Sequence, residues 1–263
     1  MKSTRHSKIV GWLLCGVLTA ACGCATPGSS SPEDEARLKH AKSNFEIGID
    51  HMDHGRYALA LQALLDAESL DPKNARIHVA LAEAYMHRGR VDDAEQHLLR
   101  AVEIYPKYHD ARLNLSALYL MSGRFSDAAR HSRMLVDDPT FPATWRALTN
   151  LGVAEIGLGN LVEARKNLQL AYEYNRAYWP ALLSLGTLAK REGRTREAIE
   201  YFQQALAQQP TPSARAEVNY RLAEVYVSLG KREQAMGYLK TAVAQSPDGE
   251  WGRKSEEYLK ILR

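Results

Sequence analysis

A repeat of 34 residues runs through most of the chain and constrains its fold more than any other feature. Residues 41–74 and 75–108 align without gaps and share Gly at repeat position 15, Ala at 20, Leu at 24, Ala at 27 and Pro at 32. Most of these marks recur in four further segments, residues 109–142, 145–178, 179–212 and 216–249. A fixed period of this length indicates a solenoid, because one short repeat cannot bury its apolar surface alone and must stack on its neighbours.

Each shared position has a structural reason. The glycine at position 15 ends the first helix of its repeat, in a left-handed conformation that other residues adopt only at a cost. The proline at position 32 ends the second helix, since it lacks an amide donor and clashes with the preceding turn. Position 8 is small because the two helices cross closely there; it is occupied by Gly48, Ala82, Ser116, Gly152, Gly186 and Ala223. This pattern resembles the tetratricopeptide repeat, which implies an all-α, right-handed α-solenoid of six repeats over residues 41–249.

Residues 250–263 follow the sixth repeat and carry an apolar stripe on an otherwise charged segment. The stripe consists of Trp251, Tyr258, Leu259 and Ile261. We predict a capping helix that covers the open end of the array, because a terminal repeat exposes apolar surface. A docking helix for a partner is the alternative.

The first 21 residues predict a secretory signal peptide. Met1–Lys8 is basic, and Ile9–Leu18 is an apolar stretch of the length typical of signal peptides and too short to span a bilayer. Small residues at 19–21 then precede Cys22. The segment resembles a bacterial lipobox, which implies cleavage before Cys22 and acylation of its sulfur. Cleavage before Cys24 is an alternative, as is a plain signal peptide that carries no lipid.

Residues 22–40 are predicted to form a flexible tether between the acylated cysteine and the folded repeats. Residues 23–32 are rich in Ser, Pro and Gly and show no helical periodicity. The residue after either cysteine is Gly23 or Ala25, not the aspartate that retains lipoproteins in the inner membrane. The lipobox resemblance therefore implies a protein anchored by its acyl chains at the periplasmic face of the outer membrane.

Charge and motifs exclude several classes of function. Three of the 34 basic residues lie in the signal segment, which leaves 31 basic and 31 acidic residues in the rest of the chain and no net attraction to nucleic acid. The chain has no G-x-S-x-G, H-E-x-x-H or glycine-rich phosphate loop. His51 and His54 lack a third metal ligand at a suitable spacing. We therefore expect no enzyme activity, no metal, no small-molecule substrate and no cofactor beyond the acyl chains.

Function is then expected on a surface. In tetratricopeptide arrays the first helix of each repeat lines the concave side, so the resemblance implies an apolar floor through repeats one to four. Its predicted residues are Phe45, Ile49, Met52, Val79, Met86, Leu113, Ala117, Leu120, Met121, Val153 and Ile156. Methionines suit a groove that accepts helices of variable sequence. For Phe45 and Leu113, burial between repeats is an equal alternative.

Polar residues are expected to orient a ligand on this floor. Asn114 and Asn150 both occupy position 6, where an asparagine in peptide-binding members of the family hydrogen-bonds the ligand backbone. Arg146 lies nearby at position 2 and could hold a carboxylate in a two-pronged hydrogen bond. Repeats five and six are more polar on the same face, which predicts a groove with an apolar half and a charged half; the charged residues are Lys190, Arg191, Arg221 and Glu224.

One departure from the regular repeat sharpens the resemblance. Phe141-Pro142 leads into a helix that carries Asn150-Leu151-Gly152, and Asn175-Arg176 ends the same repeat. Together with the lipobox, the tether and six repeats, these features resemble the pilotins of type IV pili, the PilF, PilW and Tgl group. The long basic C-terminal helix departs from that group.

The resemblance implies a role in type IV pilus biogenesis. Pilotins bind subunits of the outer-membrane secretin and promote their targeting to the membrane and their assembly into multimers. The predicted partners are therefore secretin subunits and the outer membrane itself. The alternative is a tetratricopeptide scaffold for another envelope complex, such as one for polysaccharide export or outer-membrane protein assembly.

Overall fold

The computed structural model describes residues 31–262, and within that range it contains thirteen α-helices and no strand. The predicted signal peptide, Cys22, Cys24 and the first part of the predicted tether lie outside the described residues. The first three helix pairs are α1 (Pro32–Asp53) with α2 (Tyr57–Leu70), α3 (Ala75–His87) with α4 (Val91–Ile104), and α5 (His109–Met121) with α6 (Phe125–Val136). The next three are α7 (Thr144–Leu158) with α8 (Leu161–Tyr174), α9 (Trp179–Arg191) with α10 (Thr195–Ala207), and α11 (Pro212–Ser228) with α12 (Arg232–Gln245). A last helix, α13 (Glu250–Leu262), follows them.

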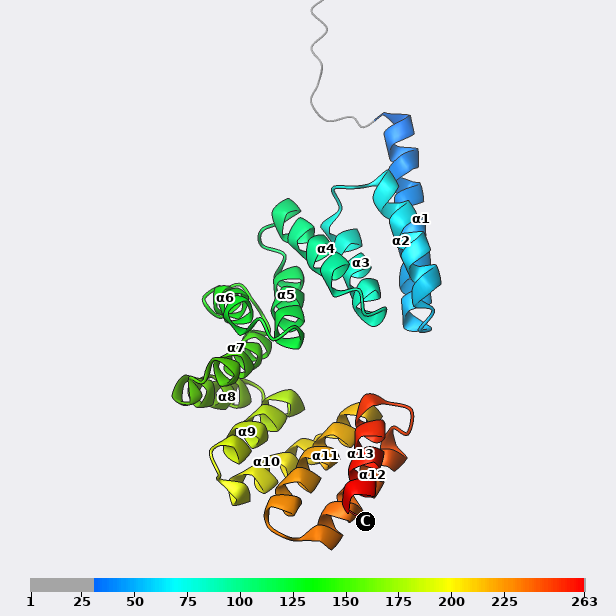
Figure 1. The fold of residues 1–263 in the computed structure, drawn as a ribbon. Coiled ribbons are helices and arrows are strands. Elements are labelled where there is room, and N and C mark those ends of the chain that lie inside the picture. The colour runs from blue at the N-terminus through cyan, green and yellow to red at the C-terminus, as the bar shows by residue number, and fades with distance from the viewer. Residues whose placement is uncertain (1–30, 263) are drawn as a thin grey trace, which may run out of the picture.

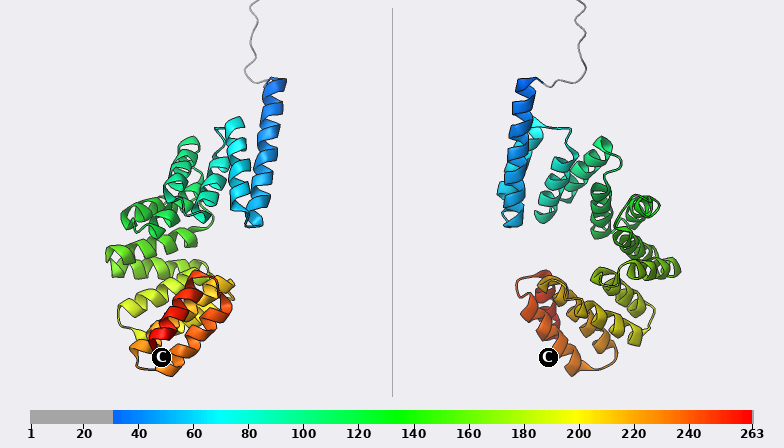
Figure 2. Two further views of the ribbon diagram at one scale, coloured as in Figure 1. Left: turned by 45° about the vertical axis from the view of Figure 1, so that its right-hand side comes forward. Right: turned by 180° about the vertical axis from the view of Figure 1, so that it is seen from behind.

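The helix pairs stack into an open arc, with α1 at one end and α13 at the other (Figures 1 and 2). Helices α3, α5, α7 and α9 lie on the inside of the arc and their partners lie outside (Figure 1). The largest cluster of buried apolar side chains extends from α2 to α7, so consecutive repeats share one core. The predicted α-solenoid of six repeats is confirmed.

The turn inside each pair depends on the glycine at position 15. Gly159 has φ +85° and its amide donates to the carbonyl of Ile156, while the next amide, of Asn160, donates to that of Glu155. These bonds satisfy carbonyl groups at the end of α7 that lack helical partners. All six glycines at this position have positive φ, as the sequence predicted.

The two helices of a repeat cross closely at position 8, opposite a large residue at position 24. A Cβ atom added at Gly152 would lie 2.5 Å from Cγ of Leu168. The third repeat solves the same contact differently, because its position 24 holds Ser132. The hydroxyls of Ser116 and Ser132 lie 2.6 Å apart and hydrogen-bond in a fully buried site.

The predicted tether is wrong over its second part, because residues 32–40 are helical. Ser31 is the N-cap, and its hydroxyl accepts a hydrogen bond from the amide of Asp34 at 3.1 Å. Pro32 opens the helix and three acidic residues follow in its first turn, which complements the helix dipole. Arg37 ties this extension to the array through a 2.5 Å hydrogen bond to the carbonyl of Leu70.

One boundary and one side chain at the C-terminal end also differ from the prediction. Helix α11 begins at Pro212 instead of Ala216, because Thr211 provides an N-cap and Pro212 the first helical position. In α13, Leu259 is buried and Trp251 packs against Tyr220 of α11 at 5.2 Å between ring centroids. Ile261, predicted to join this stripe, is 78% exposed and lies at a surface hollow beside Val227 and Arg232.

Replacing Gly152 by Ala should destabilise the protein by about 1–3 kcal/mol, since the new methyl group meets Leu168 in a packed crossing. The matched control is Gly237→Ala in α12, where no atom lies within 4 Å of the added Cβ. That change should stabilise by up to about 1 kcal/mol. Urea unfolding of the two variants measures the difference, and equal stabilities would contradict the close crossing.

A second prediction concerns His131, a buried residue of α6 whose ring nitrogens have no hydrogen-bond partner. Burial and the neighbouring arginines lower its pKa to about 4, from 6.5 in the unfolded chain. The unfolded state therefore binds the proton more tightly, and stability is lost as the pH falls from 6.5 towards 4. Between pH 7 and pH 4.5, the free energy of unfolding should fall by about 2–3 kcal/mol less in His131→Leu than in the unchanged protein. Parallel losses in both proteins would contradict this assignment.

Candidate functional site

The inner face of the arc is the candidate site, and half-buried apolar side chains form much of it. Phe45, Ile49, Met52, Val79, Met86 and Leu120 are only partly exposed and pack against the large core cluster. Ala117, Val153 and Ile156 are half-buried as well. These residues therefore have two roles: one side of each belongs to the contact between repeats, and the remainder is surface on the inner helices.

Leu113 does not belong to this surface. It is 4% exposed and packs with Leu135, Phe141 and Ala147. Phe141 fills the space under α5 because the connection from α6 to α7 contains three more residues than those between the other pairs. Of the two alternatives for Leu113, groove surface and burial between repeats, the structure shows burial. Met121, at the end of α5, is the opposite case, with 73% of its surface exposed.

Asn114 and Asn150 are the polar groups most suited to a ligand. Both are half-buried on the inner helices α5 and α7, and neither side-chain amide has a hydrogen-bond partner within residues 31–262. The equivalent position is occupied in repeat five by Ser184, whose hydroxyl donates to the carbonyl of Pro180, and in repeat six by Arg221. Only in the middle of the array does position 6 therefore offer an amide that can both donate and accept.

Arg146 is exposed on the same helix as Asn150. Its guanidinium donates a hydrogen bond to the hydroxyl of Tyr178, whose pKa burial raises and Arg146 partly lowers. Tyr178 accepts only part of the hydrogen-bonding capacity of this side chain, since a guanidinium carries five N–H donors. The remaining donors face solvent.

The charged residues on the inner face of repeats five and six form ion pairs and hydrogen bonds within the protein. Lys190 of α9 and Glu224 of α11 form an ion pair of 2.9 Å, and Arg221 contacts the same carboxylate at 3.3 Å. The guanidinium of Arg221 also lies 4.7 Å from the ring of Trp251 in α13. Arg191 donates to the carbonyl of Ile156. The charges predicted to line the groove therefore join repeats four to six and the capping helix.

Sequence reasoning did not find the pocket between α1 and α3. This cavity of about 380 Å³ is lined by Leu38, Phe45, Arg76 and Ile77 among others. The guanidinium of Arg76 lies 5.4 Å from the centre of the Phe45 ring, in a cation–π contact. A signal was present: Arg76 occupies position 2 of its repeat, as Arg146 does in repeat four.

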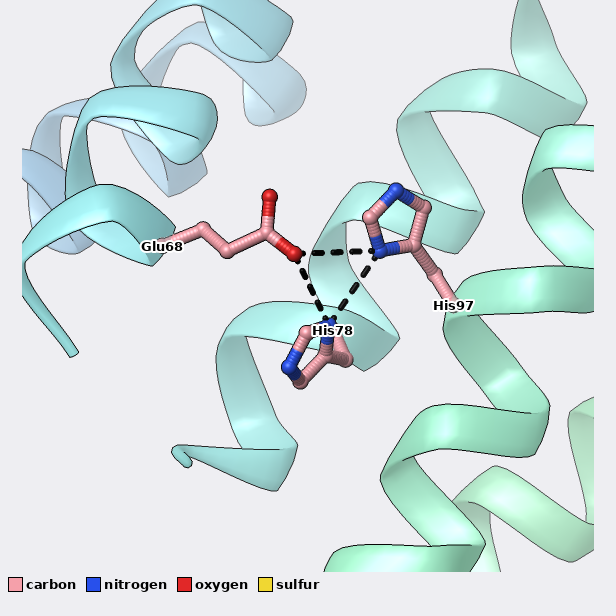
Figure 3. Close-up of side chains that lie close together, drawn as sticks. All are labelled: Glu68, His78 and His97. Carbon is pink, nitrogen blue, oxygen red and sulfur yellow. Dashed lines mark hydrogen bonds and ion pairs between the residues drawn. The ribbon is translucent and has the colours of Figure 1, made fainter. Parts of the chain in front are cut away.

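A cluster of metal-binding residue types lies elsewhere, between α2, α3 and α4, where Glu68, His78 and His97 point toward one another (Figure 3). It is the one such group found among the described residues. Sequence reasoning considered His51 and His54 instead. His54 bonds the carbonyl of Asp50, and no third ligand joins this pair.

Over the described residues, no helix combines the length and the apolar character needed to cross a bilayer.

Profiles of the tetratricopeptide repeat match residues 45–109, 113–181 and 189–253. The chain belongs to the tetratricopeptide repeat family. Repeats of this family act as protein-interaction modules, and the comparisons indicate no enzymatic family. No curated protein matches the sequence.

Solved structures share this tetratricopeptide fold at low sequence identity. PilW, described as a widely conserved type IV pilus biogenesis factor, superposes with a TM-score of 0.69 at 20% identity, over 81% of this chain and 97% of PilW. PilF of Pseudomonas aeruginosa gives 0.63 at 16%, over 85% and 99%. A tetratricopeptide repeat protein of Parabacteroides merdae gives 0.73 at 17%, over 84% of each chain. At these identities the similarity concerns the fold.

Stability measurements without a ligand can test whether the inner-face amides lack hydrogen-bond partners within the protein. Asn150→Ala removes an amide without a partner, so the free energy of unfolding should change by less than about 0.5 kcal/mol. Asn160→Ala is the matched change, because that amide donates to the buried carboxylate of Glu155 at 2.7 Å. It should cost about 1–2 kcal/mol. A comparable loss in Asn150→Ala would show that its amide is already engaged.

Proposed function

We propose that the protein is a lipid-anchored tetratricopeptide protein that binds secretin subunits of a type IV pilus and promotes their multimer assembly at the outer membrane. The observation that carries the proposal is the pair of unpartnered amides, Asn114 and Asn150, on inner helices flanked by apolar surface. A structural face would satisfy such amides within the protein, whereas a ligand-binding face leaves them for the ligand. The pilotin-like motifs of the sequence supply the identity of the partner.

Binding would use backbone and side-chain recognition together. The two amides are placed at equivalent positions of consecutive repeats, so they can donate to and accept from the backbone of one bound segment. Apolar side chains of that segment would cover the exposed parts of Met121 and Ile156, and Arg146 would take an acidic group. Methionine adapts its shape to different partners, which suits a groove of this kind.

The anchor would act by confinement. Nine peptide units separate Cys22 from Ser31, where the described structure begins, and a fully extended chain spans at most about 32 Å over that length. Helix α1 would thus be held close to the membrane surface. Holding partners at one surface raises their effective concentration without any new contact, which favours ring assembly. Several acyl chains give stable attachment where a single chain gives only marginal binding.

The fold similarity to PilW supports this proposal, since PilW is described as a type IV pilus biogenesis factor. The same similarity is equally compatible with a scaffold that binds a different protein partner, because it concerns only the fold. The partner must therefore be tested directly in cells.

The first test is an immunoblot of the secretin from unheated membranes of cells that lack the protein. We expect the heat-resistant multimer to be lost while the monomer remains. Cells that carry Cys22→Ala should show the same loss if the acyl anchor is needed, and Cys24→Ala should not. Normal multimers in the deletion strain would overturn the proposal and leave a scaffold of another envelope complex.

A second test assigns the binding face. Met121→Glu should weaken binding of the purified secretin subunit by at least about tenfold, because it places a charge on an exposed apolar contact. Val162→Glu is the control, since Val162 is 81% exposed but lies on an outer helix, α8. The double change Asn114→Ala with Asn150→Ala should weaken binding by about tenfold or more. Calorimetric titration measures both, and equal effects of Met121→Glu and Val162→Glu would move the site away from the inner face.

A further inference from the structure

Three side chains converge between the first two repeats in a way that the protein-binding role does not explain. Glu68 comes from α2, His78 from α3 and His97 from α4 (Figure 3). Nδ1 of His78 lies 3.2 Å from Nδ1 of His97 and 3.3 Å from Oε1 of Glu68. The third distance, from Nδ1 of His97 to Oε1 of Glu68, is 3.6 Å.

These distances fit one face of a tetrahedral zinc site. Zinc lies about 2.0–2.1 Å from histidine nitrogen and about 2.0–2.2 Å from carboxylate oxygen. A regular tetrahedron with such bonds has edges of about 3.3–3.5 Å between ligand atoms. The three observed separations lie within about 0.2 Å of that range, so an ion can contact all three atoms with little movement of the helices. Within residues 31–262 no fourth ligand residue joins the three, which leaves the fourth position for another ligand.

The hydrogen bond of His78 leaves its Nδ1 free to bind an ion between the three side chains. Its Nε2 lies 3.0 Å from the carbonyl oxygen of Pro72, and a carbonyl only accepts, so Nε2 carries the proton. In the neutral ring, Nδ1 then presents a lone pair to Glu68 and His97. A backbone carbonyl that holds the outer nitrogen of a histidine is the arrangement commonly found behind metal-binding histidines.

Without a cation at the centre, this arrangement is costly. If both rings are neutral, only the single Nδ1 proton of His97 can lie among the three converging atoms, and it cannot bond both Glu68 and His78. His78 is 3% exposed, so water does not compensate it. Tyr85 stacks on the ring of His97 with centroids 5.4 Å apart and covers its other side.

We propose that Glu68, His78 and His97 bind one Zn²⁺ ion, which joins the second helix of repeat one to both helices of repeat two. The open fourth position takes water or a side chain of a partner. Two nitrogens and one oxygen suit zinc, whereas Ca²⁺ and Mg²⁺ require mostly oxygen ligands. Because Glu68 belongs to a different repeat from the two histidines, the ion fixes the angle between the repeats at the N-terminal end of the arc.

Zinc binding is measured on the full chain, purified without a histidine tag and freed of metal by a chelator. Competition with a chromophoric zinc indicator should show one more ion bound by the unchanged protein than by His97→Gln. Glu68→Gln keeps the shape of the side chain and should weaken binding at least tenfold, since it removes the charged ligand. Both residues are partly exposed, so these variants avoid the deeply buried His78.

The matched control is His87→Gln, which removes an exposed histidine of α3 and should bind zinc as the unchanged protein does. Every variant keeps the same cysteines as the unchanged protein, so any zinc that they hold cancels in the comparison. Co²⁺ serves as a second probe, because a four-coordinate site gives intense visible absorption that His97→Gln should lose. Circular dichroism confirms that each variant is folded.

The structural effect is read from thermal unfolding. Saturating Zn²⁺ should raise the melting temperature of the unchanged protein by about 5 °C, and that of His97→Gln by no more than Ca²⁺ does. Equal zinc stoichiometry in the unchanged protein and His97→Gln would overturn the proposal. The cluster would then be a histidine–carboxylate ion pair that holds a proton in place of the metal. Neither outcome depends on the secretin experiments.

Discussion

The close crossing of the two helices inside each repeat is the contact on which the rest of the structure depends. A small residue at position 8 lets the backbone of one helix approach the large residue at position 24 of the other, as Gly152 does with Leu168. This contact brings the two helices of a pair together, and the stacked pairs form the arc (Figure 1). Where repeat three lacks the large residue, two buried serine hydroxyls hydrogen-bond across the same gap. The geometry is thus kept by two different interactions, apolar packing and a satisfied polar pair.

The arc places the first helix of each pair on its inner side, and this decides which residues can meet a partner. Apolar residues there are half-buried because consecutive repeats share their core. Around the two free amides of repeats three and four, the inner face therefore offers narrow apolar strips, and the cavity beside Phe45 lies at the other end of the array, between α1 and α3. Such a surface suits an extended or helical protein segment better than a small molecule, which usually requires an enclosed pocket.

The two halves of the array differ in how their inner faces are satisfied. In repeats five and six, Lys190, Arg221 and Glu224 neutralise one another, and Trp251 of the last helix covers the arginine. Charges that are paired in this way stabilise contacts between repeats and have little left for a ligand. In repeats three and four, the inner-face amides of Asn114 and Asn150 are neutral and unpaired. Recognition is therefore expected in the middle of the array, with the C-terminal repeats as its support.

Local patterns in the sequence determined the helix pairs, their glycine turns and their close crossings, because each depends on residues near one another in the chain. The start of α1 was also readable, since Ser31, Pro32 and three acids form a helix-start signal that the tether prediction overlooked. Tertiary structure decided what depends on residues far apart. Leu113 became core because Phe141 packs beneath it, and the charges of repeats five and six became internal ion pairs. Glu68, His78 and His97 met because three helices from two repeats converge, and no spacing along the chain encodes the angle between those helices.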